Sequence, residues 1–280
     1  MKLNTFFDSH AHIFAYTDKH KRDIQDLCNK NNITEVWNMS LGPENFNTVV
    51  NDYYDYNKFY KPFIGYSHDY VINLFIKHVN KEIRFFEKLA YNNIEVLELF
   101  IKYQMYKKVD FFGIGEIGID MHHPKRCLKL VSEIQACLQV QKIFFSLQLE
   151  LAKKYNLVVS VHSRKAEIEI INILQNLNYF ENVIMHSFTG SKELFVNLHL
   201  KGSFIGVNAI CTYRSGKPII EAIREILIKN KINKISTISD LYLNKILLET
   251  DSPYLCINTS ENINTPITLL DIFHYLVDTL

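Results

Sequence analysis

Residues 128–162 read LKLVSEIQACLQVQKIFFSLQLELAKKYNLVVSVH, and this stretch decides the fold. Its first part, residues 128–155, repeats apolar side chains at the spacing of one helix face, as at Ile134, Leu138 and Leu149. Its last part, Leu157–His162, is a short apolar and β-branched run that predicts a buried strand. A helix that leads into a buried strand is the repeating unit of an α/β protein.

The same alternation continues along the chain in both directions. We expect strands at Leu3–Ser9, Ile33–Ser40, Tyr60–Tyr66, Asp110–Glu116, Leu157–His162, Asn182–His186, Ser203–Val207 and Lys245–Glu249. Helical patterns lie near residues 18–31, 44–57, 70–105, 128–155, 165–176, 191–200, 216–230 and 267–279. The stretch 67–109 is longer than one barrel helix requires, so we expect two helices there.

Eight strands, each followed by helical sequence, predict a (β/α)8 TIM barrel. The length of 280 residues suits one such domain spanning residues 1–280, since these barrels take roughly 250 residues. No linker rich in Pro, Gly or Ser marks a domain boundary. A doubly wound parallel sheet is the alternative fold.

Composition narrows the class of protein. The chain has 31 basic and 30 acidic residues, so charge alone favours neither nucleic acid nor a membrane surface. No run approaches the roughly 18 apolar residues of a membrane span, and MKLNTFFDSHAH is too polar for a signal peptide. We expect a cytoplasmic or nuclear protein, a monomer, without membrane association. The cysteines are odd in number and scattered, which favours reduced thiols.

Ionisable side chains follow the predicted strands at the end where TIM barrels carry their active sites. Strand 1 ends in Asp8-Ser9-His10-Ala11-His12, and residues two apart in a strand point the same way. His10 and His12 should therefore project together into the barrel mouth. The other side chains that we place there are Glu116, His162, His186 and Asp251.

These six side chains point to a catalytic metal centre. A lone histidine after a strand more often has a structural role. Chance is a poor explanation for four histidines and two carboxylates that gather at strand ends. A nitrogen and oxygen donor set without sulfur suits Zn²⁺, Mn²⁺ or Mg²⁺. Six ligands exceed what one catalytic metal normally takes, so we expect two divalent ions with Glu116 as the bridge.

Five segments together resemble the TatD family of metal-dependent deoxyribonucleases. They cover nearly the whole chain in the family's order: Asp8-Ser9-His10-Ala11-His12, Gly115-Glu116-Ile117-Gly118-Ile119-Asp120, Val161-His162-Ser163-Arg164, Met185-His186-Ser187-Phe188-Thr189-Gly190 and Glu249-Thr250-Asp251-Ser252-Pro253-Tyr254. The resemblance implies a TIM barrel that hydrolyses phosphodiester bonds in DNA. It also implies a first metal site of His10, His12, Glu116 and Asp251, and a second of Glu116, His162 and His186.

We assign further roles on this basis. Asp251 is placed to be a ligand and the base that orients the water. His68 could contact the phosphate or the leaving oxygen, or be an ordinary loop histidine. Arg164 and Arg214 are the candidate phosphate-binding cations, with ordinary positions on the surface or behind the metal ligands as the alternative. Tyr213 and Phe188 could stack on a base, although such aromatic residues are more often packing.

Three features depart from the family pattern. Gly65-Tyr66-Ser67-His68-Asp69 stands where the family usually has Gly-x-His-Pro, so His68 comes one residue late. Asn264-Thr265-Pro266 is present, but no Arg-Gly precedes it in Leu255–Ile263. The family usually has one more C-terminal helix.

Two alternatives to a nuclease remain: a metallohydrolase of a small amide or ester, and a scaffold without activity. Glu116, where many amidohydrolases have a carboxylated lysine, favours the nuclease.

Overall fold

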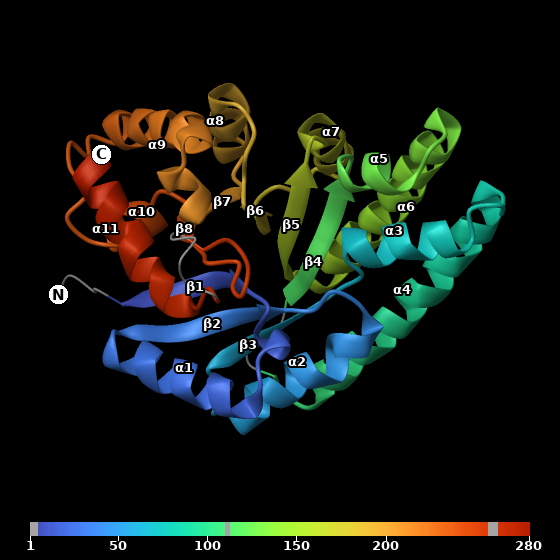
Figure 1. The fold of residues 1–280 in the computed structure, drawn as a ribbon, viewed down its shortest axis with the longest axis horizontal. Coiled ribbons are helices and arrows are strands. Elements are labelled where there is room, and N and C mark those ends of the chain that lie inside the picture. Colours follow the sequence, from blue (N-terminus) through green and yellow to red (C-terminus); the bar gives the residue numbers. More distant parts are fainter. Residues whose placement is uncertain (1–4, 110–112, 257–262) are drawn as a thin grey trace.

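The computed structural model describes residues 5–109, 113–256 and 263–280 (Figure 1). Within these ranges eight parallel strands form one sheet in sequence order. They are β1 (Phe6–Ala11), β2 (Ile33–Met39), β3 (Tyr60–Ile64), β4 (Gly113–Asp120), β5 (Val158–Arg164), β6 (Val183–His186), β7 (Phe204–Val207) and β8 (Ile246–Leu248). The predicted strands Leu3–Ser9 and Asp110–Glu116 begin partly outside the described residues.

The sheet curves round until its last strand meets its first. Ala11 and Ser252 form a parallel bridge, and the backbone N–H of His12 donates to the carbonyl of Ser252 at 2.7 Å. The N–H of Asp251 donates to the carbonyl of His10 at 2.9 Å. The result is a nearly closed (β/α)8 barrel, which confirms the predicted TIM barrel and rules out the doubly wound sheet.

Helices cover the outside of the barrel (Figure 1). The longer ones are α1 (Asp18–Lys30), α2 (Pro43–Asp55), α3 (His68–Lys77), α4 (Ile83–Tyr106), α6 (Val131–Tyr155), α7 (Glu167–Leu177), α8 (Lys192–Leu200), α9 (Lys217–Lys229) and α11 (Leu269–Thr279). The two helices expected within 67–109 are confirmed as α3 and α4. None of the helices in the described part of the chain is long and apolar enough to cross a membrane.

Several short helices were not predicted as separate elements, although two of them overlap the starts of the predicted helices 216–230 and 267–279. They are α5 (His123–Cys127), α10 (Ser239–Tyr242) and the 3-10 turns η1 (Ile13–Ala15), η2 (Ala209–Thr212), η3 (Arg214–Gly216) and η4 (Pro266–Thr268). Elements of three to five residues span barely one turn, so they create no periodic pattern to detect. Most of them lie in the connections that follow strands, around the mouth of the barrel.

Alternate residues along the strands divide the core into two parts. Side chains such as Val36 and Val183 point outward and join the main cluster under the helices. Their neighbours point inward and form a second cluster of Trp37, Met39, Phe63, Ile184 and Leu247. This alternation is the pattern of a filled barrel. The inner cluster closes the barrel below the site, so polar side chains from the strand ends stand on an apolar floor.

One strand differs from the prediction in a way that matters for the site. The prediction ended the fourth strand at Glu116, but β4 continues to Asp120. Pairing with β5 shifts between Ile114 and Ile117, which leaves one extra residue in β4. Such a bulge re-aims a side chain without ending the strand. Glu116 thus lies in mid-strand, and Asp120 stands at the strand end beside Arg164 of β5.

Candidate metal centre

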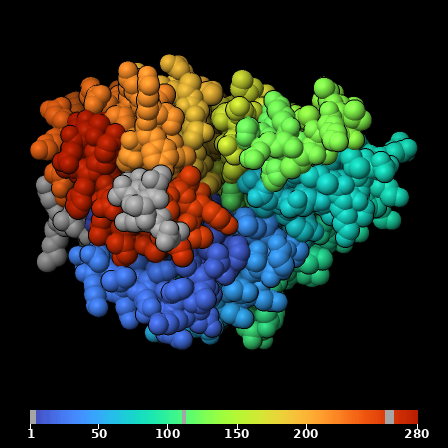
Figure 2. All heavy atoms as spheres, viewed as in Figure 1, coloured from blue at the N-terminus to red at the C-terminus, as the bar shows by residue number. Residues whose placement is uncertain are grey.

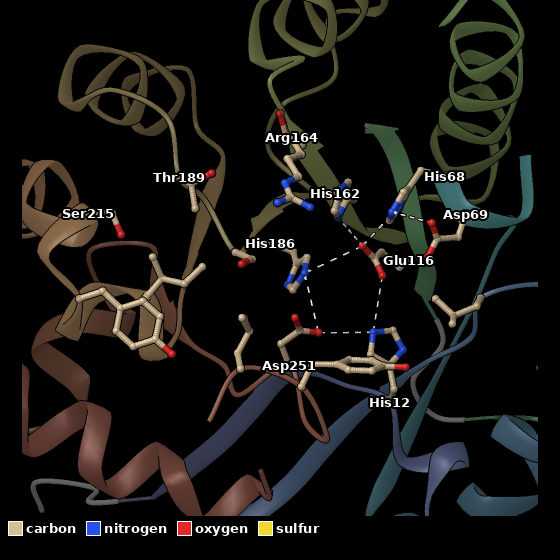
Figure 3. Close-up of a pocket in the computed structure, with 17 residues that line it drawn as sticks. His12, His68, Asp69, Glu116, His162, Arg164, His186, Thr189, Ser215 and Asp251 are labelled. Atoms are coloured by element: carbon tan, nitrogen blue, oxygen red, sulfur yellow. Dashed lines mark ion pairs between the residues drawn. The ribbon is translucent and has the colours of Figure 1, made fainter. Parts of the chain in front are cut away.

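The predicted site residues line one cavity at the carboxyl ends of the strands. Its volume is about 620 Å³. His12, Glu116, His162, His186 and Asp251 all reach it (Figure 3). His10 is fully buried and lies just below, stacked on His186 with ring centroids 3.4 Å apart. The structure therefore brings together the six side chains that sequence analysis selected.

Four of these side chains form a first donor group. Nε2 of His10 and Nε2 of His12 lie 3.3 Å apart. Oε2 of Glu116 is 3.8 Å from His10 Nε2 and 3.5 Å from His12 Nε2. Oδ1 of Asp251 is 3.8 Å and 3.4 Å from the same two nitrogens. Donors that bind one cation at about 2.0–2.2 Å lie up to about 4.4 Å apart, so the donors of His10, His12 and Glu116 fit a single ion. Oδ1 of Asp251 lies within the same range of both histidines.

A second donor group faces the other oxygen of Glu116. Oε1 of Glu116 lies 2.8 Å from Nδ1 of His162 and 3.9 Å from Nε2 of His186. The two oxygens of this one carboxylate thus face two different groups of histidines. That arrangement is what a carboxylate bridging two cations requires.

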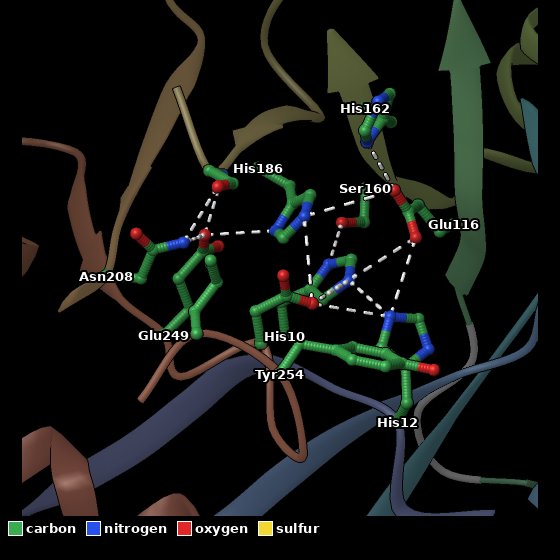
Figure 4. A network of polar contacts seen from close by, with 12 residues as sticks. His10, His12, Glu116, Ser160, His162, His186, Asn208, Glu249 and Tyr254 are labelled. Carbon is green, nitrogen blue, oxygen red and sulfur yellow. Dashed lines mark hydrogen bonds and ion pairs between the residues drawn. The ribbon is translucent and has the colours of Figure 1, made fainter. Parts of the chain in front are cut away.

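Three residues lie at the outer nitrogens of these histidines, and Figure 4 labels two of them, Ser160 and Glu249. Nδ1 of His10 is 2.8 Å from the Ser160 hydroxyl, and Nδ1 of His186 is 3.0 Å from Oε1 of Glu249. Nε2 of His162 is 3.4 Å from Oδ2 of Asp120. An acceptor at the outer nitrogen fixes the proton there, so the lone pair of the inner nitrogen faces the cavity.

The donor set fits divalent cations better than a proton network. Oδ1 of Asp251 is buried and has no hydrogen-bond partner among the described residues. Nε2 of His10 and Nε2 of His12 are both acceptors when their outer nitrogens are protonated, yet they lie within contact distance. A cation between them satisfies both lone pairs and the Asp251 oxygen. The absence of sulfur suits Mg²⁺, Mn²⁺ or Zn²⁺ at an open catalytic site.

The carboxylates of the cavity raise the pKa of two histidines beside them, His162 and His186. Burial lowers the pKa of His162, but hydrogen bonds to Asp120 and Glu116 outweigh it and raise the pKa to about 9. Burial likewise lowers the pKa of His186, and the charges of Glu249 and Asp251 raise it to about 10. The buried carboxylates of the cavity therefore stabilise positive charge. Without a metal, the protonated histidines carry that charge.

His68 lies in the cavity although it comes one residue later than the family pattern. It is the first residue of α3, and its ring stacks on His162 with centroids 3.6 Å apart. Its Nδ1 is 3.8 Å from Oε1 of Glu116. Burial and the neighbouring His162 lower the pKa of His68 to about 4, so the ring is neutral at pH 7.

The predicted phosphate-binding and stacking residues divide into two sets. Arg164 and Tyr213 line the cavity. Arg214 is exposed and is not among the lining residues. Phe188 is buried and packs edge-on against Phe195, with ring centroids 5.7 Å apart. Phe188 is therefore a packing residue and is not available to stack on a base.

Sequence reasoning gave no role to several residues at the site. Asp120 and Glu249 orient histidines, and Tyr254 covers His12 with its ring edge-on at 5.5 Å. All three stand inside the motifs quoted above, two of them as carboxylates at strand ends. Their position at strand ends was the sequence feature that could have identified Asp120 and Glu249 as site residues. Asp69 was missed as well, and its Oδ1 lies 3.4 Å from Nε2 of His68.

A nearly closed eight-stranded barrel with a histidine and carboxylate centre at its mouth defines the class of metal-dependent α/β-barrel hydrolases. The sequence matches the family described as TatD related DNase over residues 7–280. The chain belongs to this family and is a metal-dependent hydrolase.

Individual relatives agree. An uncharacterized metal-dependent hydrolase from Buchnera aphidicola is 27% identical over 89% of this chain and 81% of its own length. A putative deoxyribonuclease from Vairimorpha ceranae is 34% identical over 53% of this chain and 45% of its own length. Among solved structures, a TatD homologue from Escherichia coli superposes with a TM-score of 0.72 and 20% identity. That match covers 98% of this chain and 90% of that chain, and it supports the fold.

Proposed function

We propose that this protein is a deoxyribonuclease that hydrolyses phosphodiester bonds with two divalent ions. The observation that carries the proposal is the position of Glu116, whose Oε2 faces His10 and His12 while its Oε1 faces His162. The first site would use His10, His12, Glu116 and Asp251. The second would use Glu116, His162 and His186.

Phosphodiester hydrolysis needs an activated water and neutralisation of negative charge. Two divalent ions, when bound, supply both, because they lower the pKa of a water and offset the charge on the phosphate oxygens. Asp251 lines the cavity, and its Oδ1 accepts no hydrogen bond from the described residues, so the carboxylate can orient the attacking water and accept its proton. Glu116 holds the two donor groups in one geometry.

Other side chains of the cavity suit a nucleotide. Arg164 reaches the cavity from the end of β5 and offers a planar guanidinium to a phosphate (Figure 3). The neutral ring of His68 can donate a hydrogen bond to the phosphate or to the leaving oxygen. Tyr213 and Tyr254 line the cavity and are 38% and 49% exposed, so either ring can stack on a base. The donors lie at the floor of a cavity, which suits attack near a chain end.

The other candidate reaction is hydrolysis of a small amide or ester at the same centre. One assay separates the two reactions. The purified protein is loaded with Mg²⁺, Mn²⁺ or Zn²⁺ and given end-labelled single-stranded DNA, beside a panel of small esters and amides. The proposal expects metal-dependent release of short products from the labelled DNA. Turnover of a small ester or amide, with intact DNA under every metal, would overturn it.

A further inference from the structure

Four cations lie at and just beyond the carboxyl ends of β4 and β5, where Arg164 lines the cavity. The reaction above does not use the other three. We propose that Lys125, Arg126, Arg164 and Lys165, which we call the basic rim, bind the phosphate backbone of a single-stranded nucleic acid beyond the reacting phosphate. This inference rests on the proposed function, because it names where the rest of that substrate lies.

Backbone geometry places the basic rim at the mouth. Arg164 is the last residue of β5 and pairs in register with Asp120, the last residue of β4. The N–H of Met121 then donates to the carbonyl of Arg164 at 3.0 Å. The chain continues directly into α5, which carries Lys125 and Arg126 in its last turn. In Figure 1, α5 stands next to the tips of β4 and β5.

The start of α5 is fixed to the site itself. Oδ1 of Asp120 accepts from the backbone N–H groups of His122 and His123 at 2.6 Å and 2.8 Å. Nδ1 of His123 lies 2.8 Å from Oδ1 of Asp69 on α3. The same Asp120 carboxylate holds His162 through its other oxygen. The basic rim is therefore tied to the donor groups through one side chain, so its position relative to the reacting phosphate is defined.

The charges of the basic rim are not neutralised by the protein. All four side chains are exposed, and within the described residues none of them forms an ion pair. Some other exposed cations among the described residues are paired, as Lys192 and Lys229 are with Glu225. The pKa of His122 is lowered chiefly by Arg164, and further by burial and by Lys165, which places these charges close together.

An unpaired group of cations beside a phosphodiesterase centre has a clear chemical partner. Backbone phosphates bind lysine and arginine without regard to sequence, and the binding weakens steeply with salt. The net charge of +1 gives no sign of the basic rim. Its residues come from two separate segments, 125–126 and 164–165, so no single basic run marks it in the sequence. The space-filling view shows the segment around residues 121–130, in bright green, at the surface of the molecule (Figure 2).

The test measures binding apart from cleavage. Fluorescein-labelled dT12 is titrated with the protein in EDTA, and anisotropy gives Kd at several salt concentrations. The test variant is Lys125→Gln/Arg126→Gln. The matched control is Lys30→Gln/Lys231→Gln, which removes the same charge at the carboxyl ends of α1 and α9, away from the mouth. Lys165→Gln tests the other segment of the rim.

We expect the test variant to bind dT12 about tenfold more weakly at moderate salt, with the salt slope reduced by about 1.4, since each phosphate contact to a single strand contributes about 0.7. Lys165→Gln should reduce the slope by about 0.7, and the control should match the wild type. Equal Kd and slope in the test variant and wild type, or no binding by the wild type, would overturn the proposal. If the wild type binds as expected but cleaves no DNA with any metal, the basic rim stands and the proposed nuclease activity fails.

Discussion

Oε1 of Glu249 lies 3.0 Å from Nδ1 of His186, in the buried layer directly beneath the cavity. The same oxygen accepts from the backbone N–H of Ser187 at 2.6 Å and from the Asn208 amide at 3.2 Å. The charge of Glu249, in ion-pair contact with Nδ1 of His186, therefore favours a proton on this outer nitrogen. The lone pair of Nε2 then points toward Glu116 and Asp251, where a cation is expected.

Glu249→Gln should weaken metal binding. The variant removes the negative charge behind His186 and places an amide where a carboxylate now holds the imidazole. Loss of such an outer-shell carboxylate typically costs 10–100-fold in metal affinity. Titration of metal-free protein with Zn²⁺ measures the effect, and Glu225→Gln, on the outer surface, is the matched control. Equal affinities for wild type and Glu249→Gln would show that Glu249 does not act through His186.

Asp120→Asn should affect the second donor group. The amide oxygen can still accept from His122 and His123, so the start of α5 is retained. The amide N–H₂ faces Nε2 of His162, which favours a lone pair on Nε2 and moves the proton to Nδ1, toward Glu116. That nitrogen can then no longer bind a cation.

Metal stoichiometry measures this change. We expect Asp120→Asn to retain about one of two ions after dialysis, while wild type retains both. The histidine Nδ1 and Nε2 resonances in ¹⁵N spectra provide an independent reading of the tautomer. Full occupancy together with an unchanged His162 tautomer would contradict the assigned role of Asp120.

Glu98 should make stability depend on pH far from the site. It joins α4 to α6, with Oε1 at 2.8 Å from Lys102, 3.0 Å from Lys154 and 2.5 Å from the Tyr155 hydroxyl. These hydrogen bonds, that of Lys102 first, lower the pKa of Glu98 from 4.5 to about 2. A lowered pKa stabilises the fold above pH 4.5, and this contribution disappears as pH falls toward 2.

Urea unfolding of wild type and Glu98→Gln between pH 7 and pH 2.5 checks this. The Glu98 side chain is 20% exposed and its two lysine partners are more than half exposed, so solvent screens the ion pairs. We therefore expect a difference in unfolding free energy below about 1 kcal/mol at pH 7. The difference should shrink as pH falls below 4.5. A difference that stays constant down to pH 2.5 would mean that the ionised form of Glu98 gains nothing from its partners.

Much of the fold was readable because hydrophobic periodicity records which face of each element is buried. Helix α6 begins at Val131 and ends at Tyr155, close to the predicted 128–155. The donor side chains were predicted because histidines and carboxylates at successive strand ends have few structural explanations. The end of β4 was missed because a bulge at Glu116 does not change the apolar character of the residues that follow.

The supporting residues could not be predicted because they depend on register between strands. Ser160 meets His10 across 150 positions of sequence, and no local pattern reports that contact. Gly118 is a similar case. Its φ is +149°, and a Cβ there would stand 2.0 Å from the backbone oxygen of His162. The sequence contains this glycine, but only the pairing of β4 with β5 shows why a side chain is excluded.

The most direct test of the two-ion account is the rate of metal-dependent hydrolysis of end-labelled single-stranded DNA by Glu116→Ala, compared with wild type at equal protein concentration. Loss of the bridge should disturb both donor groups while leaving the barrel folded, as circular dichroism would show. We predict less than about a tenth of wild-type activity, a loss of at least ~1.4 kcal/mol in transition-state stabilisation. A folded Glu116→Ala protein that retains more than this would contradict the role of Glu116 as the bridge.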